Sequence, residues 1–163
     1  MNLQFYLEKL KESEEYKKFI KENPRASPCF IFFSLDKKGN DNKQQFDFLV
    51  GKKILRFHLE NNSHMEEIDI KDSQPSKKLL MNYNLDFDEL EDKILDRMEK
   101  EGVKKDIQKM MLLIQNIEGK DTITAIIFVS GMGLLKSKID AKSLNILEFE
   151  NKSFFDMFKV VRK

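Results

Sequence analysis

Few side chains in this chain of 163 residues are suited to nucleophilic chemistry. It has one cysteine, Cys29, and two histidines, His58 and His64. A cysteine nucleophile needs a base within hydrogen-bonding reach, and the segment around His58 is predicted to lie in the same group of strands as Cys29. Cys29 directly precedes the apolar run FIFF, however, and no cysteine-protease signature surrounds it. We therefore predict that Cys29 is a small buried hydrophobic residue.

The residues that could hold a metal ion are His58, Glu60 and His64, followed by Glu66 and Glu67. The run HLENNSH does not match the helical HExxH pattern of zinc proteases and falls on a predicted strand and turn. We expect His58 on the exposed face of a strand and His64 in a loop. The sequence therefore predicts no metal site.

Two other motifs favour structural roles. The run SGMG lacks the Lys-Ser/Thr pair that follows the glycines of a phosphate-binding loop, so its glycines are expected to permit a bend. Asp88, Glu91 and Asp92 fall near the start of a predicted helix, where acidic side chains complement the helix dipole. We predict no catalytic residue and no cofactor.

Composition narrows the class of protein. Charged residues make up 35% of the chain, but lysine alternates with glutamate and the net charge is only +1. A nucleic-acid-binding protein usually shows an excess of basic residues, so we expect no nucleic-acid partner. The longest apolar runs, CFIFF and AIIFV, are too short to span a bilayer, so we expect no stable membrane insertion. These features predict a cytoplasmic protein with one domain over residues 1–163.

The first half of the chain reads as a helix followed by strands. Apolar residues at three- and four-residue spacing predict a helix over residues 2–22, which ends at Asn23 because a proline follows. Strands are predicted at residues 29–35, 44–50, 54–60 and 65–71. Short turns and the alternation in ILRFHLE indicate an antiparallel meander with one side in water. In the fourth strand Ile68 and Ile70 are expected to be buried.

A polar segment, residues 72–78, is the predicted flexible linker. Beyond it, Asp86 with Glu89 forms the capping-box pattern that begins a helix, and Gly102 ends it. A second apolar stripe over residues 103–117 predicts another helix. It includes Met110, Met111 and Ile114, and we expect the methionines, with Met98, to be core residues.

The last strands are predicted at residues 122–130, 134–140 and 144–149. The run TITAIIFV is apolar on both faces, as expected for a strand in the middle of a sheet. Ile123 and Ile127 from this run should be buried together with Phe57 and Ile114. No internal repeat is evident. The predicted fold class is α+β, with an antiparallel sheet meander and helices packed on one face.

Several segments also suggest a family. The helix end FIKENPRAS, the strand ITAIIF and the strand ending in IDA occur in an order that resembles uncharacterised archaeal α+β proteins with PepSY-like or cystatin-like folds. In IDAKSLNILEFE, Ser143, Leu144 and Asn145 replace the Thr-Gly of a common PepSY pattern, and Asn145 is expected to supply the left-handed turn residue. The resemblance implies a fold and, because PepSY domains are associated with protease regulation and protein binding, a binding role. It implies no functional residue.

The segment 153–161 is the best candidate for a partner contact. It is predicted to be a short helix with Phe154, Phe155 and Phe158 along one side. These side chains either pack on the chain's own core or contact a partner or a membrane surface. Two functions remain open: a non-enzymatic protein-binding or regulatory module whose partner is another protein, or a small-ligand carrier or enzyme with a pocket between sheet and helices.

We expect a weak homodimer, formed through a sheet edge or through segment 153–161. The strand CFIFFSL is apolar on both faces, so it must be interior or covered, and exposed edges offer unpaired backbone groups to a second copy. Full-length protein should sediment as a dimer at micromolar concentration, and deletion of the residues after Glu150 should change its sedimentation. A monomer at that concentration would contradict the prediction.

Overall fold

The computed structural model describes residues 1–60, 63–68 and 77–153. In the first half the elements are α1 (Leu3–Glu12), α2 (Glu14–Glu22), β1 (Ser27–Asp36), β2 (Lys43–Val50), β3 (Lys53–His58) and β4 (His64–Ile68). In the second half they are α3 (Phe87–Lys100), β5 (Ile107–Ile117), β6 (Lys120–Val129), β7 (Gly133–Asp140) and β8 (Ile146–Ser153).

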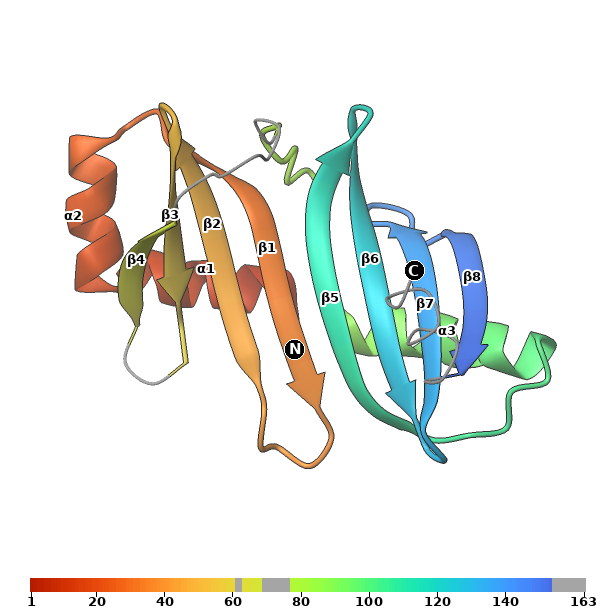
Figure 1. Ribbon diagram of the computed structural model, residues 1–163. Coiled ribbons are helices and arrows are strands. Elements are labelled where there is room, and N and C mark those ends of the chain that lie inside the picture. Colours follow the sequence, from red (N-terminus) through yellow and green to blue (C-terminus); the bar gives the residue numbers. More distant parts are fainter. Residues whose placement is uncertain (61–62, 69–76, 154–163) are drawn as a thin grey trace, which may run out of the picture.

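The strands form one antiparallel sheet in the order β4-β3-β2-β1-β5-β6-β7-β8. The helices of the described part lie on one face of it, with α1 and α2 behind the first four strands and α3 behind the last four (Figure 1). The predicted α+β class is confirmed. The strand CFIFFSL is interior, because β1 pairs with β2 on one side and β5 on the other, and the edges of the sheet are β4 and β8.

The two halves repeat one arrangement, which the sequence does not reveal. Each consists of a helical segment followed by four strands that pair in order, and the first strands of the two halves, β1 and β5, meet at the centre of the sheet. The helix starts meet as well. Asn2 and Asp86 cap α1 and α3 and pair as a β-bridge, in which Leu3 N donates to Leu85 O and Phe87 N to Met1 O.

The predicted helix over residues 2–22 is two helices. At Ser13 the backbone is extended, and the Ser13 hydroxyl donates to Leu10 O (2.7 Å) and accepts from Tyr16 N (3.3 Å). This N-cap satisfies the first amides of α2 and lets the chain change direction. The change brings Tyr16 and Phe19 of α2 against the rings of Phe48 and Phe57.

The predicted helix over residues 103–117 is wrong, because residues 107–117 form β5. Its run IQKMMLLIQNI fits a helical stripe and also fits a strand that is apolar on both faces. Residues 107–117 form a strand because they pair with β1 on one side and β6 on the other. Each pairing supplies hydrogen-bond partners for their backbone N–H and C=O groups. Met110 points into the core, as predicted, whereas Met111 points to the other face.

The core lies between the sheet and the helices as one hydrophobic cluster. Phe57, Ile114, Ile123 and Ile127 all belong to it and are at most 1% exposed, so their predicted burial is confirmed. Around the junction of the two halves, Phe33 packs against rings from α1 and α3.

Three smaller predictions have different outcomes. Ile68 is only half-buried, because it belongs to the edge strand β4 and lies on the face away from the helices. The left-handed residue of the β7–β8 turn is Leu144 (φ 62°) and not Asn145. Ile70, residues 72–76 of the linker, and Phe154, Phe155 and Phe158 lie outside the described residues, so the predictions for them stay predictions.

Two neighbouring isoleucines of β6 test which face is the core. Ile127→Asp should lower the free energy of unfolding by at least about 4 kcal/mol, because it places an unpaired carboxylate in the core. Ile126 points to the other face and is half-buried, so Ile126→Asp should cost about 1 kcal/mol. Urea denaturation of both variants measures the difference. Equal losses of stability would contradict the assignment of the two faces.

Candidate functional site

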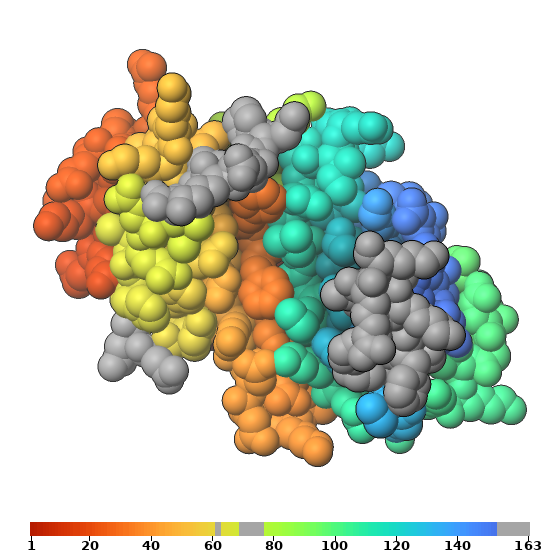
Figure 2. All heavy atoms as spheres, viewed as in Figure 1, coloured from red at the N-terminus to blue at the C-terminus, as the bar shows by residue number. Residues whose placement is uncertain are grey.

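The face of the sheet away from the helices, called here the open face, carries half-buried apolar side chains at its centre. They come from three adjacent strands, β1, β5 and β6, and each alternates with core residues of its own strand. We call this set the central apolar band: Phe30, Phe32, Met111, Leu113, Ile126 and Phe128. Figure 2 views this face and shows the side chains of β1 and β5 across its middle.

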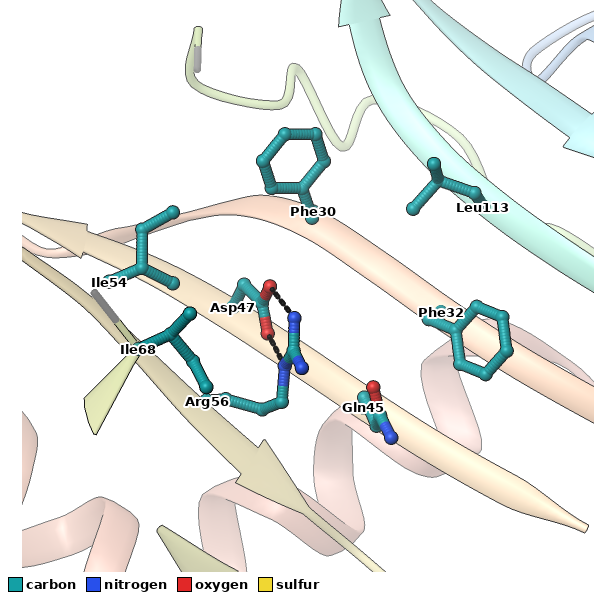
Figure 3. Close-up of a pocket in the computed structure, with 8 residues that line it drawn as sticks. All are labelled: Phe30, Phe32, Gln45, Asp47, Ile54, Arg56, Ile68 and Leu113. Atoms are coloured by element: carbon teal, nitrogen blue, oxygen red, sulfur yellow. Dashed lines mark hydrogen bonds and ion pairs between the residues drawn. The ribbon is translucent and has the colours of Figure 1, made fainter. Parts of the chain in front are cut away.

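A hollow of about 340 Å³ lies beside the band. Its lining residues are Phe30, Phe32, Gln45, Asp47, Ile54, Arg56, Ile68 and Leu113. Asp47 and Arg56 form its polar centre, where the guanidinium donates to both carboxylate oxygens at 2.8 and 2.9 Å (Figure 3). The hydrogen bonds from Arg56 to Asp47 raise the pKa of Arg56 above its usual value. The two charges compensate each other, so the hollow is apolar and close to neutral.

The register of the β2–β3 hairpin creates this ion pair. Asp47 and Arg56 are direct cross-strand partners, and their side chains alternate with the core residues Phe46, Phe48 and Phe57. The sequence analysis does not identify the pair. Opposite charges in KQQFDFLV and KILRFH would point to it only once the pairing of the two strands is known.

A second polar cluster on the open face contains both histidines. His58 Nδ1 lies 3.2 Å from Glu60 Oε1, and His58 Nε2 lies 2.8 Å from Glu66 Oε1. The His64 ring stacks on the His58 ring with centroids 4.6 Å apart. The hydrogen bond from His58 lowers the pKa of Glu66. His58 is on the open face, as predicted, but His64 begins β4 and is not in a loop.

The arrangement of these side chains does not suit a metal ion. In the part of the chain that the structure describes, no group of three or more His, Cys, Asp or Glu residues has the geometry of a metal site. Both ring nitrogens of His58 already face carboxylates.

Cys29 is 1% exposed and its thiol donates to Asp47 O at 3.4 Å. Burial, with a smaller contribution from the charge of Asp47, raises the pKa of the thiol to about 11. A nucleophilic cysteine needs the opposite shift. The structure thus places Cys29 in the structural role predicted for it.

The other motifs also have structural roles. The run SGMG makes the turn between β6 and β7, with Gly131 and Met132 at positive φ. Of the acidic residues in α3, Asp88 lies in the first turn and Glu91 forms an ion pair with Lys37 at 2.5 Å.

A buried carboxylate that the sequence analysis overlooks, Asp121, fixes the segment before α3. It accepts from Leu80 N and Met81 N at 3.0 Å and from Tyr83 Oη at 2.6 Å. Burial and the contact with Asp121 raise the pKa of Tyr83. Throughout the described ranges, no buried side-chain nitrogen or oxygen lacks a hydrogen-bond partner. The contacts of Asp121 therefore stabilise the fold by holding the segment before α3 against β6.

The chain matches no family model and no curated protein. Among solved structures, it is similar to a lipoprotein candidate from Clostridium difficile 630, with a TM-score of 0.57 and 12% sequence identity over 85% of this chain and 91% of that chain. At this identity the likeness shows the fold alone. Within residues 1–60, 63–68 and 77–153, no helix is long and apolar enough to cross a membrane.

The raised pKa of Cys29 predicts slow thiol labelling. The neutral thiol is the form that the fold stabilises, so this stabilisation is present below the unfolded pKa, about 8.5, and is lost as pH rises through about 11. Iodoacetamide at pH 8 should label the folded protein at least 100-fold more slowly than the protein in 6 M guanidinium chloride, on the order expected for a buried thiol. Comparable rates in the two conditions would contradict this account.

Proposed function

We propose that this protein is a non-enzymatic protein-binding module and that the open face of its sheet binds the partner. The central apolar band carries the proposal. On a sheet with one side in water, alternate residues should be polar. At the centre of this sheet many outward positions are instead Phe, Met, Leu and Ile, with Ser34 and Thr124 among them. Contiguous apolar surface that stays partly exposed marks interaction sites in soluble proteins.

The surroundings of the band support a protein partner. Toward the edges of the sheet charged side chains occupy many outward positions, with Glu66 on β4, Lys136 and Lys138 on β7, and Glu148 on β8. An apolar centre, rich in aromatic residues and surrounded by a polar rim, is the usual anatomy of a protein–protein interface.

The hollow beside the band is suited to an anchor residue of the partner. Among the described residues that line it, most are aromatic or aliphatic, and the charged pair, Asp47 and Arg56, is mutually compensated. A neutral side chain that enters it meets no uncompensated charge. A few such buried anchors supply most of the affinity of a typical interface.

The proposal includes a regulatory role, a PepSY-like or cystatin-like relationship and a cytoplasmic location. The helical segment and strand meander of the first half support the relationship, whereas the helical pair that the resemblance implies next is a single helix, α3, followed by β5. Association with protease regulation and protein binding is what that resemblance implies. A homodimer through a sheet edge remains part of the proposal, with β4 and β8 as the available edges.

A small-molecule ligand is the second candidate, and the hollow is the observation that favours it. Its volume, about 340 Å³, is within the range of ligand sites. It lies on the open face rather than between sheet and helices. Native mass spectrometry of protein purified from its native host would detect such a ligand as a fixed additional mass, which Phe32→Asp should remove.

Site-specific photocrosslinking in the native host tests the proposed binding face. A benzoyl-phenylalanine residue at position 32 should give one discrete adduct with another protein, because Phe32 belongs both to the band and to the hollow. The matched control is the same residue at position 95, since Leu95 is 42% exposed on α3. No adduct at position 32, or the same adduct at both positions, would contradict the proposal.

A further inference from the structure

Among the residues that the structure describes, the edge strand β4 makes few apolar contacts with the rest of the fold. It pairs with β3 through five residue pairs, from Ile54–Ile68 to His58–His64. Its residues at positions 64–67 are exposed, and neither Met65 nor Ile68 belongs to the hydrophobic core cluster. A strand attached in this way depends on its backbone ladder and on polar side-chain contacts.

One of these contacts is the ion pair of Lys53 with Glu67 at 3.4 Å, and another passes through His58. Its Nε2 reaches Glu66 on β4, and its Nδ1 reaches Glu60, which follows β3. The other carboxylate oxygen of Glu60 accepts from the backbone Gln44 N of β2 at 3.0 Å. His58 therefore links β2 to β4 through two carboxylates, across the width of β3.

This geometry requires a particular protonation state. A neutral imidazole has one N–H and one lone pair, whereas both nitrogens of His58 face carboxylate oxygens at hydrogen-bonding distance. Only the imidazolium donates to both, and such charge-assisted bonds are the strong ones. When the ring loses a proton, one nitrogen lone pair must face a carboxylate, so one of the two links is lost.

Other charged or titratable side chains lie near His58 on the open face. His64 and Glu66 face it from β4, Arg56 lies on the same face of β3, and Lys43 and Asp47 lie on that face of β2. Arg56 is bound to Asp47, and Lys43 pairs with Asp41.

The stacked ring of His64 adds a constraint. Two positive rings with centroids 4.6 Å apart repel, and of the two histidines it is His58 that the Glu60 and Glu66 carboxylates contact. These carboxylates therefore stabilise a positive charge on the ring of His58 rather than on that of His64.

We propose that His58 is a proton-controlled latch that fastens the edge strand β4 to the sheet. The imidazolium holds the latch closed, and loss of its proton loosens β4. The hydrogen bond from His58 lowers the pKa of Glu66, which favours the carboxylate form that accepts this bond. Because Ile68 of β4 lines the hollow, loosening of β4 also alters the hollow. The effect of this change on partner binding rests on the proposed function.

Hydrogen exchange and NMR on the free full-length protein test the latch without any partner, so its failure is separate from a failure of the proposed binding role. At pH 6 both ring nitrogens of His58 should give protonated ¹⁵N shifts. Between pH 6 and pH 8.5, the protection factors of the β4 amides should fall at least tenfold, with those of β1 unchanged.

Two variants make the test specific. His58→Gln should give low β4 protection that no longer depends on pH, because glutamine cannot donate to two carboxylates in this geometry. The control His64→Gln leaves both carboxylate contacts of His58 intact and should keep the pH dependence. A singly protonated His58 at pH 6, pH-independent β4 protection in the wild type, or equal pH dependence in His58→Gln would each overturn the proposal.

Discussion

The pairing of β1 with β5 is the constraint on which the rest of the molecule depends. Seven residue pairs, from Phe30–Gln115 to Asp36–Lys109, join the two halves into one sheet. Because both strands are interior, their helix-facing side chains must be apolar, and Phe33 and Ile114 are completely buried there. The opposite positions carry no such requirement, yet Phe30 and Phe32 of β1 and Met111 and Leu113 of β5 are apolar too. The β1–β5 strand pair therefore contributes side chains to the core on one face and to the central apolar band on the other.

The parts of the fold that local patterns determine could be predicted from the sequence. The alternation in ILRFHLE predicts β3, and the N-cap Asp86 with the Gly102 stop predicts α3. Residues 107–117 could not be assigned in this way, because their apolar pattern fits a helix and a two-sided strand equally well. Pairing with a strand some 80 residues away decides between the two. The break at Ser13 had a local signal, since a serine followed by two glutamates favours an N-cap.

The candidate site was harder to predict because its chemistry depends on strand register. Asp47 and Arg56, like His58 and Glu66, are neighbours only when specific strands pair with a specific alignment. By its residue type and spacing His58 could be a base or a metal ligand, and the structure places it between two carboxylates instead. The polar groups Asp47, Arg56 and His58 on this face are paired within the fold, whereas the central apolar band stays half-buried.

The most direct measurement of the central claim is the affinity for the partner identified by crosslinking. Phe32→Ala removes a ring from both the central apolar band and the hollow, and loss of a central aromatic anchor costs about 2 kcal/mol or more. Isothermal titration should therefore show affinity reduced at least about 30-fold. The matched control is Phe5→Ala, since Phe5 is 48% exposed on α1, and its affinity should remain that of the wild type. Equal affinities for Phe32→Ala and the wild type, with both proteins folded, would contradict the account.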